Sequence, residues 1–534
     1  MTTVALPRSR RDVLVPPSLA ALLASILVWL GPPGTDLAAH VYQRALYLQH
    51  GFLLWNNFWY AGRYSFVTYS LLYYPLAAAI GIGLLAVVTV AVAVASFSAL
   101  AQREWGEQSR WASWAFALCW AALVVSGAYP FMLGSAFALV ALYAVQRGHV
   151  WAFVAAAALA LASSPLAFLL LVVVLTGIAL AGRDRTARLV VPAVAVVGMA
   201  GVEIVLQRMF PGGGTFPFSV AEFLAVVTFC LLGIGLTWNV GAARILRWMF
   251  VAYLAACTAT FAVSSPVGEN IARLRFAAVP ITILMLSLRR WRPWPVCTAV
   301  MALALSWNFS PIAASLVRGA GDPAAHAAYW RPAIAYLHRH VTPSYRVEAV
   351  DTAGHWPANF LAGARIPLAR GWFRQEDFPQ NRVLYGPLGR SAYLAWLRRL
   401  GVRYVVLTTA TPDYSARGEA RLLASGRSGL KVVFRTPTTR IFEVPSPRPL
   451  VARPARVLAL GYTSMRLFVP KPGRYRLAVT YSPYWHTPHG CLAPTQDGMS
   501  QLIATETGVV RLHFDVTTRR ALRAIIGGDD NACG

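Results

Sequence analysis

Long apolar segments alternate with short polar loops through roughly the first 310 residues of the chain. The apolar runs recur at about 17–25 residues, which is long enough for a helix to cross a bilayer. A large soluble core would need polar positions at the 3.6-residue period of an amphipathic helix, and the runs lack them. The pattern therefore predicts a polytopic α-helical membrane protein.

The candidate membrane spans number about eleven. They lie at 14–32, 69–99, 111–129, 131–146, 150–163, 165–182, 189–207, 219–237, 248–263, 276–288 and 294–310. The first span is expected to remain in the protein, because GPPG follows it and no small-residue cleavage site does.

Composition and charge agree with this class. The 534 residues are 57% hydrophobic and 13% charged, whereas soluble domains usually carry about 25% charged residues. The net charge of +27 is almost entirely arginine, with Lys431 and Lys471 as the exceptions, and we expect no nucleic-acid partner. Arginines gather in alternate loops, which the positive-inside rule places in the cytoplasm. These are Arg8, Arg10, Arg11, Arg103, Arg110, Arg147, Arg183, Arg185, Arg188, Arg244, Arg247, Arg289, Arg290 and Arg292.

This orientation puts the N-terminus of the chain inside the cell. With an odd number of spans, everything after residue 311 is then expected outside the cytoplasm, anchored in the plasma membrane.

The stretch GTDLAAHVYQRALYLQHGFLLWNNFWYAGRYSF follows the first span and is expected on the outer face. Its first part has helical spacing. Asp36 stands at the start of this helix, where a carboxylate caps free N–H groups and meets the positive end of the helix dipole. The apolar face of the helix is expected at Leu37, Val41, Ala45 and Leu48.

Two interpretations of this stretch remain open. Asp36 is either a helix cap or a catalytic carboxylate. His40, four residues later on the same helix face, either pairs with Asp36, assists proton transfer or binds phosphate. The aromatic side chains are either an interfacial belt or contacts to substrate. They are Trp55, Trp59, Tyr60 and Tyr64.

Further ionisable groups are expected near the outer face of the membrane. Ionisable groups at membrane depth are costly and are usually functional or paired. A cleft that mixes carboxylates with arginines suits a phosphate-bearing lipid, because arginine forks bind phosphate. The alternative is a set of structural ion pairs. The candidates are Glu203, Glu222, Glu269, Arg63, Arg208, Arg273 and Arg275.

The chain changes character near residue 311, where long apolar runs stop. AYWRPAIAYLHRHV predicts an amphipathic helix, and YRVEAVD and RYVVLTT predict strands, which together indicate an α/β domain at 311–447. GRYRLAVTYSPYW, QLIATETGVVRLHFDV and ALRAIIGG indicate a β-sandwich at 448–534. We assign residues 1–310, including an outer loop at 33–68, to the membrane domain.

Cysteine usage fits this topology. Cys491 and Cys533 fall in the expected outer region, where an oxidising compartment favours a disulfide. The remaining cysteines lie in or beside spans and are expected to be packing residues. They are Cys119, Cys230, Cys257 and Cys297.

Loops of the C-terminal region are rich in groups that suit a sugar ring. The alternatives are that the tryptophans fill a domain core, and that the pair Glu376 and Asp377 is exposed and solvated. The candidate acceptor contacts are Trp356, Trp372 and Trp485, with His355, His486 and His489 nearby in sequence.

A family resemblance adds to this interpretation. Asp36, Leu37 and His40, then WNNFWYAG, then Tyr73, Tyr74 and Pro75 resemble the first outer loop of the GT-C glycosyltransferase superfamily. More narrowly, they are similar to bacterial membrane proteins described as 6-pyruvoyl-tetrahydropterin-synthase-related. GAYPFMLGSAFAL and ALASSPLAFLLL also resemble that group, so the resemblance covers roughly residues 14–310.

The resemblance implies transfer of a sugar from a polyprenyl-phosphate donor to an envelope glycan or glycolipid at the outer face. Asp36 matches the family acid that acts as base or helps to hold a divalent cation, Mg²⁺ or Mn²⁺. Many members carry a paired acid here, and this chain has one. The role of the second acid of the pair would then fall to a carboxylate elsewhere in the chain, and the candidates are Glu203, Glu222 and Glu269.

Two other classes of function remain open: a transporter or flippase of lipid-linked glycan, and a non-catalytic envelope-assembly protein. The sequence contains no Walker A, HExxH or GxSxG pattern, and GGG at 212–214 follows no strand.

Overall fold

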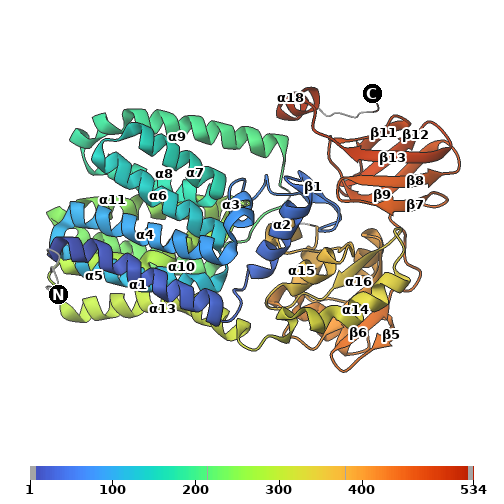
Figure 1. Ribbon diagram of the computed structural model, residues 1–534, viewed down its shortest axis with the longest axis horizontal. Coiled ribbons are helices and arrows are strands. Elements are labelled where there is room, and N and C mark those ends of the chain that lie inside the picture. Colours follow the sequence, from blue (N-terminus) through green and yellow to red (C-terminus); the bar gives the residue numbers. More distant parts are fainter. Residues whose placement is uncertain (1–7, 213, 379, 527–532, 534) are drawn as a thin grey trace, which may run out of the picture. The chain divides into compact units, whose positions relative to one another are not determined.

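The computed structural model describes residues 8–212, 214–378, 380–526 and 533, with only the backbone described at 8–12 and 183–189. It separates into two compact units (Figure 1). The helical unit joins Met1–Leu37, Tyr69–Glu203 and Thr215–Ala320, and the mixed unit joins Ala38–Thr68, Ile204–Gly214 and Gly321–Gly534. Among the arginines that predict the orientation in the membrane, several have side chains that the structure does not describe. They are Arg8, Arg10, Arg11, Arg183, Arg185 and Arg188.

The helical unit is a bundle of apolar helices (Figure 1). Its helices are α1 (Arg8–Leu30), α3 (Tyr73–Ile80), α4 (Ile82–Trp105), α5 (Arg110–Ala122), α6 (Tyr129–Arg147), α7 (Val150–Ser163), α8 (Pro165–Ala181), α9 (Arg183–Met209), α10 (Val220–Thr237), α11 (Arg244–Ala262), α12 (Ala278–Leu288) and α13 (Trp294–Gly319). Short 3₁₀ segments join them: η1 (Gly106–Ser109), η2 (Leu123–Ser126), η3 (Gly241–Ala243) and η4 (Gly268–Ala277).

Eight segments among the described residues are long and apolar enough to cross a membrane, judged by length and composition. One of them, Ile82–Ser126, contains both α4 and α5, while α7 and α8 are shorter apolar helices. Each expected span coincides with a helix, but several ends move. The span expected at 69–99 breaks at Gly81, which has φ +84°, and α13 continues to Gly319, beyond the boundary expected at 310. The count of about eleven spans stays a prediction.

Small residues set the closest helix contacts of the bundle. A Cβ atom on Gly134 of α6 would lie 2.9 Å from the Cβ of Ser164, and one on Gly177 of α8 would lie 2.8 Å from the main-chain nitrogen of Met249 in α11. Glycine therefore allows these backbones to approach, as small residues do in membrane bundles. Ser164 also begins α8, because its hydroxyl accepts the N–H of Ala167 while Pro165 follows it.

The mixed unit contains a four-stranded α/β sheet of order β3-β4-β6-β5. Its strands are β3 (Arg346–Ala349), β4 (Val402–Thr408), β5 (Lys431–Arg435) and β6 (Thr439–Glu443), and β3 and β4 run parallel. The helices are α14 (Ala327–His340), α15 (Trp356–Gly363), α16 (Arg390–Arg399) and α17 (Arg417–Ala424), with 3₁₀ segments η5 (Pro323–Ala325), η6 (Arg374–Asp377), η7 (Arg382–Tyr385) and η8 (Tyr414–Ala416). Gly401, with φ +75°, follows α16 and precedes β4, so the predicted helix, glycine stop and strand are all found.

Two further sheets pack around a second core in the mixed unit. One has the order β10-β13-β8-β7 and the other β11-β12-β9. The strands are β7 (Arg456–Leu460), β8 (Ser464–Val469), β9 (Gly473–Thr480), β10 (Trp485–His486), β11 (Gly490–Pro494), β12 (Met499–Ala504) and β13 (Gly508–Phe514). Alternating positions such as Leu467, Leu477 and Leu502 fill the space between the sheets.

The end of the sandwich differs from the prediction. ALRAIIGG was expected to extend a strand, but Thr518–Ile526 forms helix α18. Arginine, alanine and leucine are strong helix formers, and Leu522 and Ile526 recur four residues apart.

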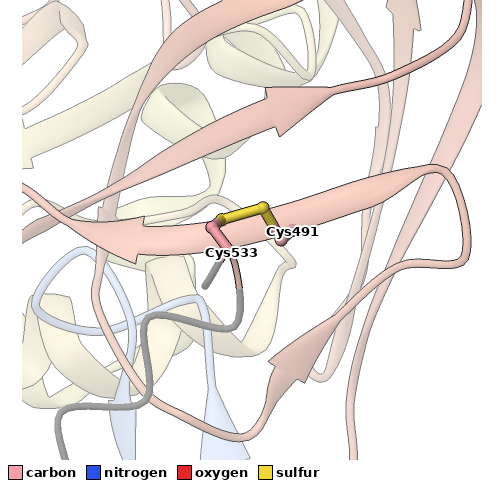
Figure 2. Close-up of a disulfide and its surroundings, with 2 residues drawn as sticks. All are labelled: Cys491 and Cys533. Atoms are coloured by element: carbon pink, nitrogen blue, oxygen red, sulfur yellow. A yellow bond between two sulfur atoms is a disulfide. The ribbon is translucent and has the colours of Figure 1, made fainter.

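Cys491 on β11 and Cys533 form a disulfide, the pairing expected from sequence, with Cα atoms 5.2 Å apart (Figure 2). The other cysteines, Cys119, Cys230, Cys257 and Cys297, are free and buried.

The first outer loop belongs with the mixed unit, not with the membrane domain to which it was assigned. Its hairpin of β1 (Trp55–Asn56) and β2 (Arg63–Tyr64) contributes Trp55 and Tyr64 to the sandwich core. Trp55 is fully buried, 5.0 Å from the ring of Phe514 and 5.9 Å from that of Trp485. Burying an aromatic side chain of this size stabilises a fold by roughly 2–3 kcal/mol, so the loop is part of this core.

The helix after Asp36 is present as α2 (Leu37–His50), but its buried face was wrong. The buried positions are Ala38, Ala39, His40, Tyr42, Gln43 and Leu46, whereas Leu48 is 55% exposed. Polar His40 and Gln43 turn inward because partners are available there. The hydroxyl of Ser65, for example, donates to the side-chain oxygen of Gln43.

Candidate functional site

Asp36 is held at the start of α2 by a close main-chain contact within the helical unit. Its N–H donates to the carbonyl of Ser126 at 3.2 Å, in the turn between η2 and α6. The turn passes through Gly127, whose φ is +73°, and a Cβ atom there would lie 2.8 Å from the Asp36 nitrogen. Gly34 allows the same approach from the other side, since its Cβ would lie 2.8 Å from the nitrogen of Gly127. Two glycines therefore fix the backbone that carries the Asp36 carboxylate.

Charged and phenolic groups converge around Asp36 in the helical unit. Burial raises the pKa of Tyr69, the Arg273 guanidinium opposes that shift, and the Asp36 carboxylate adds to it. Interactions of this kind require the three groups to be near one another. Arg273 comes from η4, and its guanidinium carbon lies 5.2 Å from the ring centroid of Phe131 at the start of α6. An acid, a phenol and a cation from three separate segments of the chain thus influence one another electrostatically.

An apolar cavity of about 430 Å³ extends from Arg273 into the helical unit. Its walls come from α4, α5, α6, α8, α11, α12 and η4, and they include Phe131 near one end of α6 and Gln146 near the other. At 1.5 Å per residue these two positions are about 22 Å apart along the helix. Arg103 and Glu104 line the cavity beside Gln146, whose amide donates to Glu104 at 3.4 Å. The cavity is therefore long, mostly apolar and charged at both ends.

Two of the other predicted acids satisfy structural roles. Glu222 lies 3.0 Å from Arg275 and accepts the indole N–H of Trp307 at 2.8 Å. Glu269 accepts the main-chain N–H of Ser219, the residue that caps α10. These contacts correspond to the alternative of structural pairs. Glu203, near the end of α9, is half-buried.

The outer-loop residues predicted to bind substrate lie inside the mixed unit. Trp59 is 1% exposed and donates its indole N–H to the carbonyl of Ala358, while Tyr60 is also buried. Arg63 stacks 3.6 Å from the ring centroid of Phe373 and lies 3.4 Å from Glu376. With Trp55 in the sandwich core, these residues hold the loop in place.

The predicted acceptor-binding tryptophans are also buried. Trp356 packs 5.6 Å from Phe360, Trp372 packs 4.5 Å from Phe373, and Trp485 belongs to the sandwich core. All three are less than 9% exposed, which corresponds to the alternative in which tryptophans fill a core. His40 is buried with its ring 5.6 Å from that of Trp372. Asp36 belongs to the helical unit and His40 to the mixed unit, and the pairing of Asp36 with His40 stays a prediction.

The sequence interpretation missed a buried ionic network in the α/β domain. Asp377 was expected to be exposed, but it is fully buried and accepts from Arg370 at 2.8 Å. Arg374, three residues before it, pairs with Asp351 and with Asp413, the latter at 3.0 Å. The i,i+3 spacing of Arg374 and Asp377 on one short helix was the available signal.

This network fills the edge of the sheet where ligands often bind. Asp351 follows β3 and Asp413 follows β4, and the carboxyl ends of parallel strands form the usual binding edge of an α/β sheet. Burial favours neutral groups, but the nearby His355 and Arg374 hold the pKa of Asp351 below its usual range. Burial lowers the pKa of His355, but the charge and hydrogen bond of Asp351, 2.6 Å away, together with the charge of Asp413, leave that pKa raised overall. The charges of the network balance one another, which suits a structural role, although Nη1 of Arg370 and Nε and Nη1 of Arg374 are buried without a hydrogen bond.

Among the described residues, no group of three or more His, Cys, Asp or Glu side chains is arranged to hold a metal ion. Mg²⁺ sites usually combine carboxylates with other oxygen ligands, while Asp36 is accompanied by Arg273 and Tyr69. A cation and a phenol beside a single carboxylate do not fit a divalent metal ion.

Solved structures share the fold. An arabinofuranosyltransferase AftD from mycobacteria, a mutant form determined by single-particle cryo-EM, matches 89% of this chain with a TM-score of 0.50 and 16% identity. This chain shares the fold of that structure over the matched residues. A second AftD structure covers 95% of the chain with a TM-score of 0.47 and 16% identity. The chain spans 44% and 40% of those two proteins.

This likeness concerns the fold alone, and it gives no support to the narrower 6-pyruvoyl-tetrahydropterin-synthase-related group. No protein family and no curated protein matches the chain. The apolar helices are those of a membrane protein.

Proposed function

We propose that the protein is a membrane glycosyltransferase that takes a sugar from a polyprenyl-phosphate donor. The observation that carries the proposal is a long apolar cavity that reaches Arg273, whose guanidinium interacts, as the Asp36 carboxylate does, with Tyr69. A lipid-phosphate sugar has matching parts: an apolar chain, an anionic phosphate and a sugar carried on that phosphate. The shared fold with an arabinofuranosyltransferase adds support from an independent direction.

The chemistry follows from these positions. The acceptor hydroxyl gives its proton to the Asp36 carboxylate while its oxygen attacks the anomeric carbon of the donor sugar. The bond between that carbon and the phosphate oxygen breaks, and the polyprenyl phosphate leaves with the electron pair. Arg273 stabilises the charge that develops on the phosphate, because a guanidinium fork binds phosphate oxygens well. Single displacement predicts inversion at the anomeric carbon.

Separate assays of lipid binding and of sugar transfer distinguish the role of Arg273 from that of Asp36. In nanodiscs, Arg273→Gln should bind polyprenyl phosphate about tenfold or more weakly, since a hydrogen bond to a charged group contributes about 1.5–3 kcal/mol. Polyprenol, which lacks the phosphate, should bind both proteins alike. Asp36→Asn should bind the phosphate normally and lose transfer by about 10²–10⁴-fold. Arg318→Gln, an exposed arginine at the end of α13, is the matched control.

Equal binding of polyprenyl phosphate by wild type and Arg273→Gln would contradict the phosphate role of Arg273. Full transfer activity in Asp36→Asn would contradict the role of Asp36 as base.

One observation favours a second candidate, a flippase of lipid-linked glycan. The cavity follows most of α6 and has charged residues near both ends, Arg273 at one and Arg103 at the other. Sealed proteoliposomes loaded with a fluorescent lipid-phosphate sugar distinguish the two. Movement of the intact lipid between leaflets supports transport, and release of polyprenyl phosphate with a glycosylated acceptor supports transfer.

A further inference from the structure

Helix α18 of the mixed unit carries an exposed apolar face. Leu522 is 54% exposed and Ile526 is 82% exposed, and their i,i+4 spacing puts them on the same side of the helix. Ala521 is buried, and Ala524 packs against the sandwich core from the opposite side. The helix is thus attached to the domain by its small residues, and its large apolar residues point away from the core.

The helix lies beside the end of a membrane span. Arg208, at the end of α9, donates to the main-chain carbonyl of Ile525 at 3.5 Å. Leu206 and Met209 of α9 pack against the same sandwich core as Ala524. Val190–Met209 is one of the segments long and apolar enough to cross a bilayer. Contact with the last residues of that segment places α18 beside the end of this candidate span.

The charges nearby suit lipid head groups. Arg208 and Arg519 are exposed, and Ile204 and Val205 of α9 are 58% and 39% exposed on the span. Arg519 precedes Leu522 by one turn on the same exposed side of α18, so its long side chain can reach the phosphates while Leu522 and Ile526 enter the acyl region, as at membrane interfaces. Basic residues near the surface add attraction to anionic lipids.

We propose that α18 binds the surface of an anionic lipid bilayer, with Leu522 and Ile526 inserted among the acyl chains and Arg208 and Arg519 at the phosphates. The contact ties the outer β-sandwich to the membrane independently of the sugar-transfer site. It does not rest on the proposed function.

Photocrosslinking in the full-length protein tests this contact. Leu522, Ile526 and, as a control, Val509 are replaced one at a time by p-benzoylphenylalanine. The protein is placed in nanodiscs of phosphatidylcholine and phosphatidylglycerol with radiolabelled lipid. Val509 on β13 is 50% exposed, closely matching Leu522, but belongs to a strand of the sandwich. Positions 522 and 526 should crosslink lipid at least about fivefold more than position 509.

A second measurement tests the contribution of the Arg519 charge to lipid binding. With the probe at 522, Arg519→Gln should lower the phosphatidylglycerol crosslink about fivefold, since one basic residue near the surface contributes about 1 kcal/mol. Arg466→Gln, an exposed arginine on β8, should leave it unchanged. Equal crosslinking at 522 and 509 overturns the proposal, and an unchanged lipid preference in Arg519→Gln overturns its anionic part. An unchanged thermal-unfolding midpoint shows that the Arg519→Gln protein is folded.

Discussion

The main-chain N–H of Asp36 donates to the carbonyl of Ser126 at 3.2 Å, across a turn that only glycine fits. This contact sets the position of the acid from which the proposed chemistry starts. It joins the segment after the first span to the turn between η2 and α6, so two distant parts of the sequence define one carboxylate position.

Gly127→Ala should therefore impair the protein more than an ordinary glycine substitution. The methyl group would lie 2.8 Å from the Asp36 nitrogen, and φ +73° is unfavourable for alanine. We expect a loss of about 2–4 kcal/mol in stability, or a displaced Asp36 with reduced activity. Gly51→Ala is the control, because Gly51 has φ +68° with open space around it. Equal thermal-unfolding midpoints and activities for the two variants would contradict the close contact.

Glu419 should make stability depend on pH. Burial raises the pKa of this carboxyl from its ordinary 4.5 to about 7, and the neighbouring Glu348 is also buried with a raised pKa. Between these two pH values the Glu419 carboxyl is ionised in the unfolded chain but still protonated in the folded chain. Stability therefore falls as pH rises from about 4.5 to about 7. Glu419→Gln removes the ionisation and keeps an oxygen for the hydroxyl of Tyr393, 2.6 Å away.

Thermal unfolding of the Glu419→Gln protein from pH 5 to pH 8 measures this effect. The variant should gain on the order of 2 kcal/mol over wild type at pH 8 and little at pH 5. Glu443→Gln, at a partly exposed ion pair with Arg403, is the control. The same pH slope in wild type and Glu419→Gln would show that the carboxyl is ionised in the fold.

Asp377 should contribute strongly to the stability of the mixed unit. Its pKa lies below the ordinary 3.8, because Arg370 and Arg374 outweigh the effect of burial. The stabilisation is present above that ordinary value and is lost as the pH falls below it. Asp377→Asn leaves Arg370 buried without its charge partner and should cost about 3–5 kcal/mol. Asp497→Asn, which breaks a partly exposed pair with Arg476, should cost about 1 kcal/mol or less. A chemical-denaturation series compares the two, and equal losses would contradict the buried network.

The sequence predicted the positions of helices and strands better than it predicted which of their residues pack together. Apolar runs identified each helix of the helical unit, since a span needs about 20 apolar residues regardless of its neighbours. Alternation identified β3, β4, β9, β12 and β13 for the same local reason. It could not reveal that Trp55 completes the core around Trp485, because a contact between residues so far apart leaves no local pattern. Glu376 and Asp377 looked exposed because their partners, Arg63 and Arg370, are set by the fold.

Within the site, sequence selected Asp36 and Arg273 but offered several equivalent acids and arginines beside them. Only the fold distinguishes Arg273, at the cavity, from Arg275, which pairs with Glu222. Tyr69 was missed, because a tyrosine beside a membrane span is ordinary in sequence.

The envelope glycan and glycolipid profile of a deletion strain tests the central claim most directly. The strain is complemented with wild type, Asp36→Asn or the control Arg318→Gln at equal membrane abundance. The account predicts that wild type and Arg318→Gln restore a missing glycan, while Asp36→Asn does not and a lipid-linked sugar accumulates. Full restoration by Asp36→Asn would contradict the account and leave Asp36 as a helix cap.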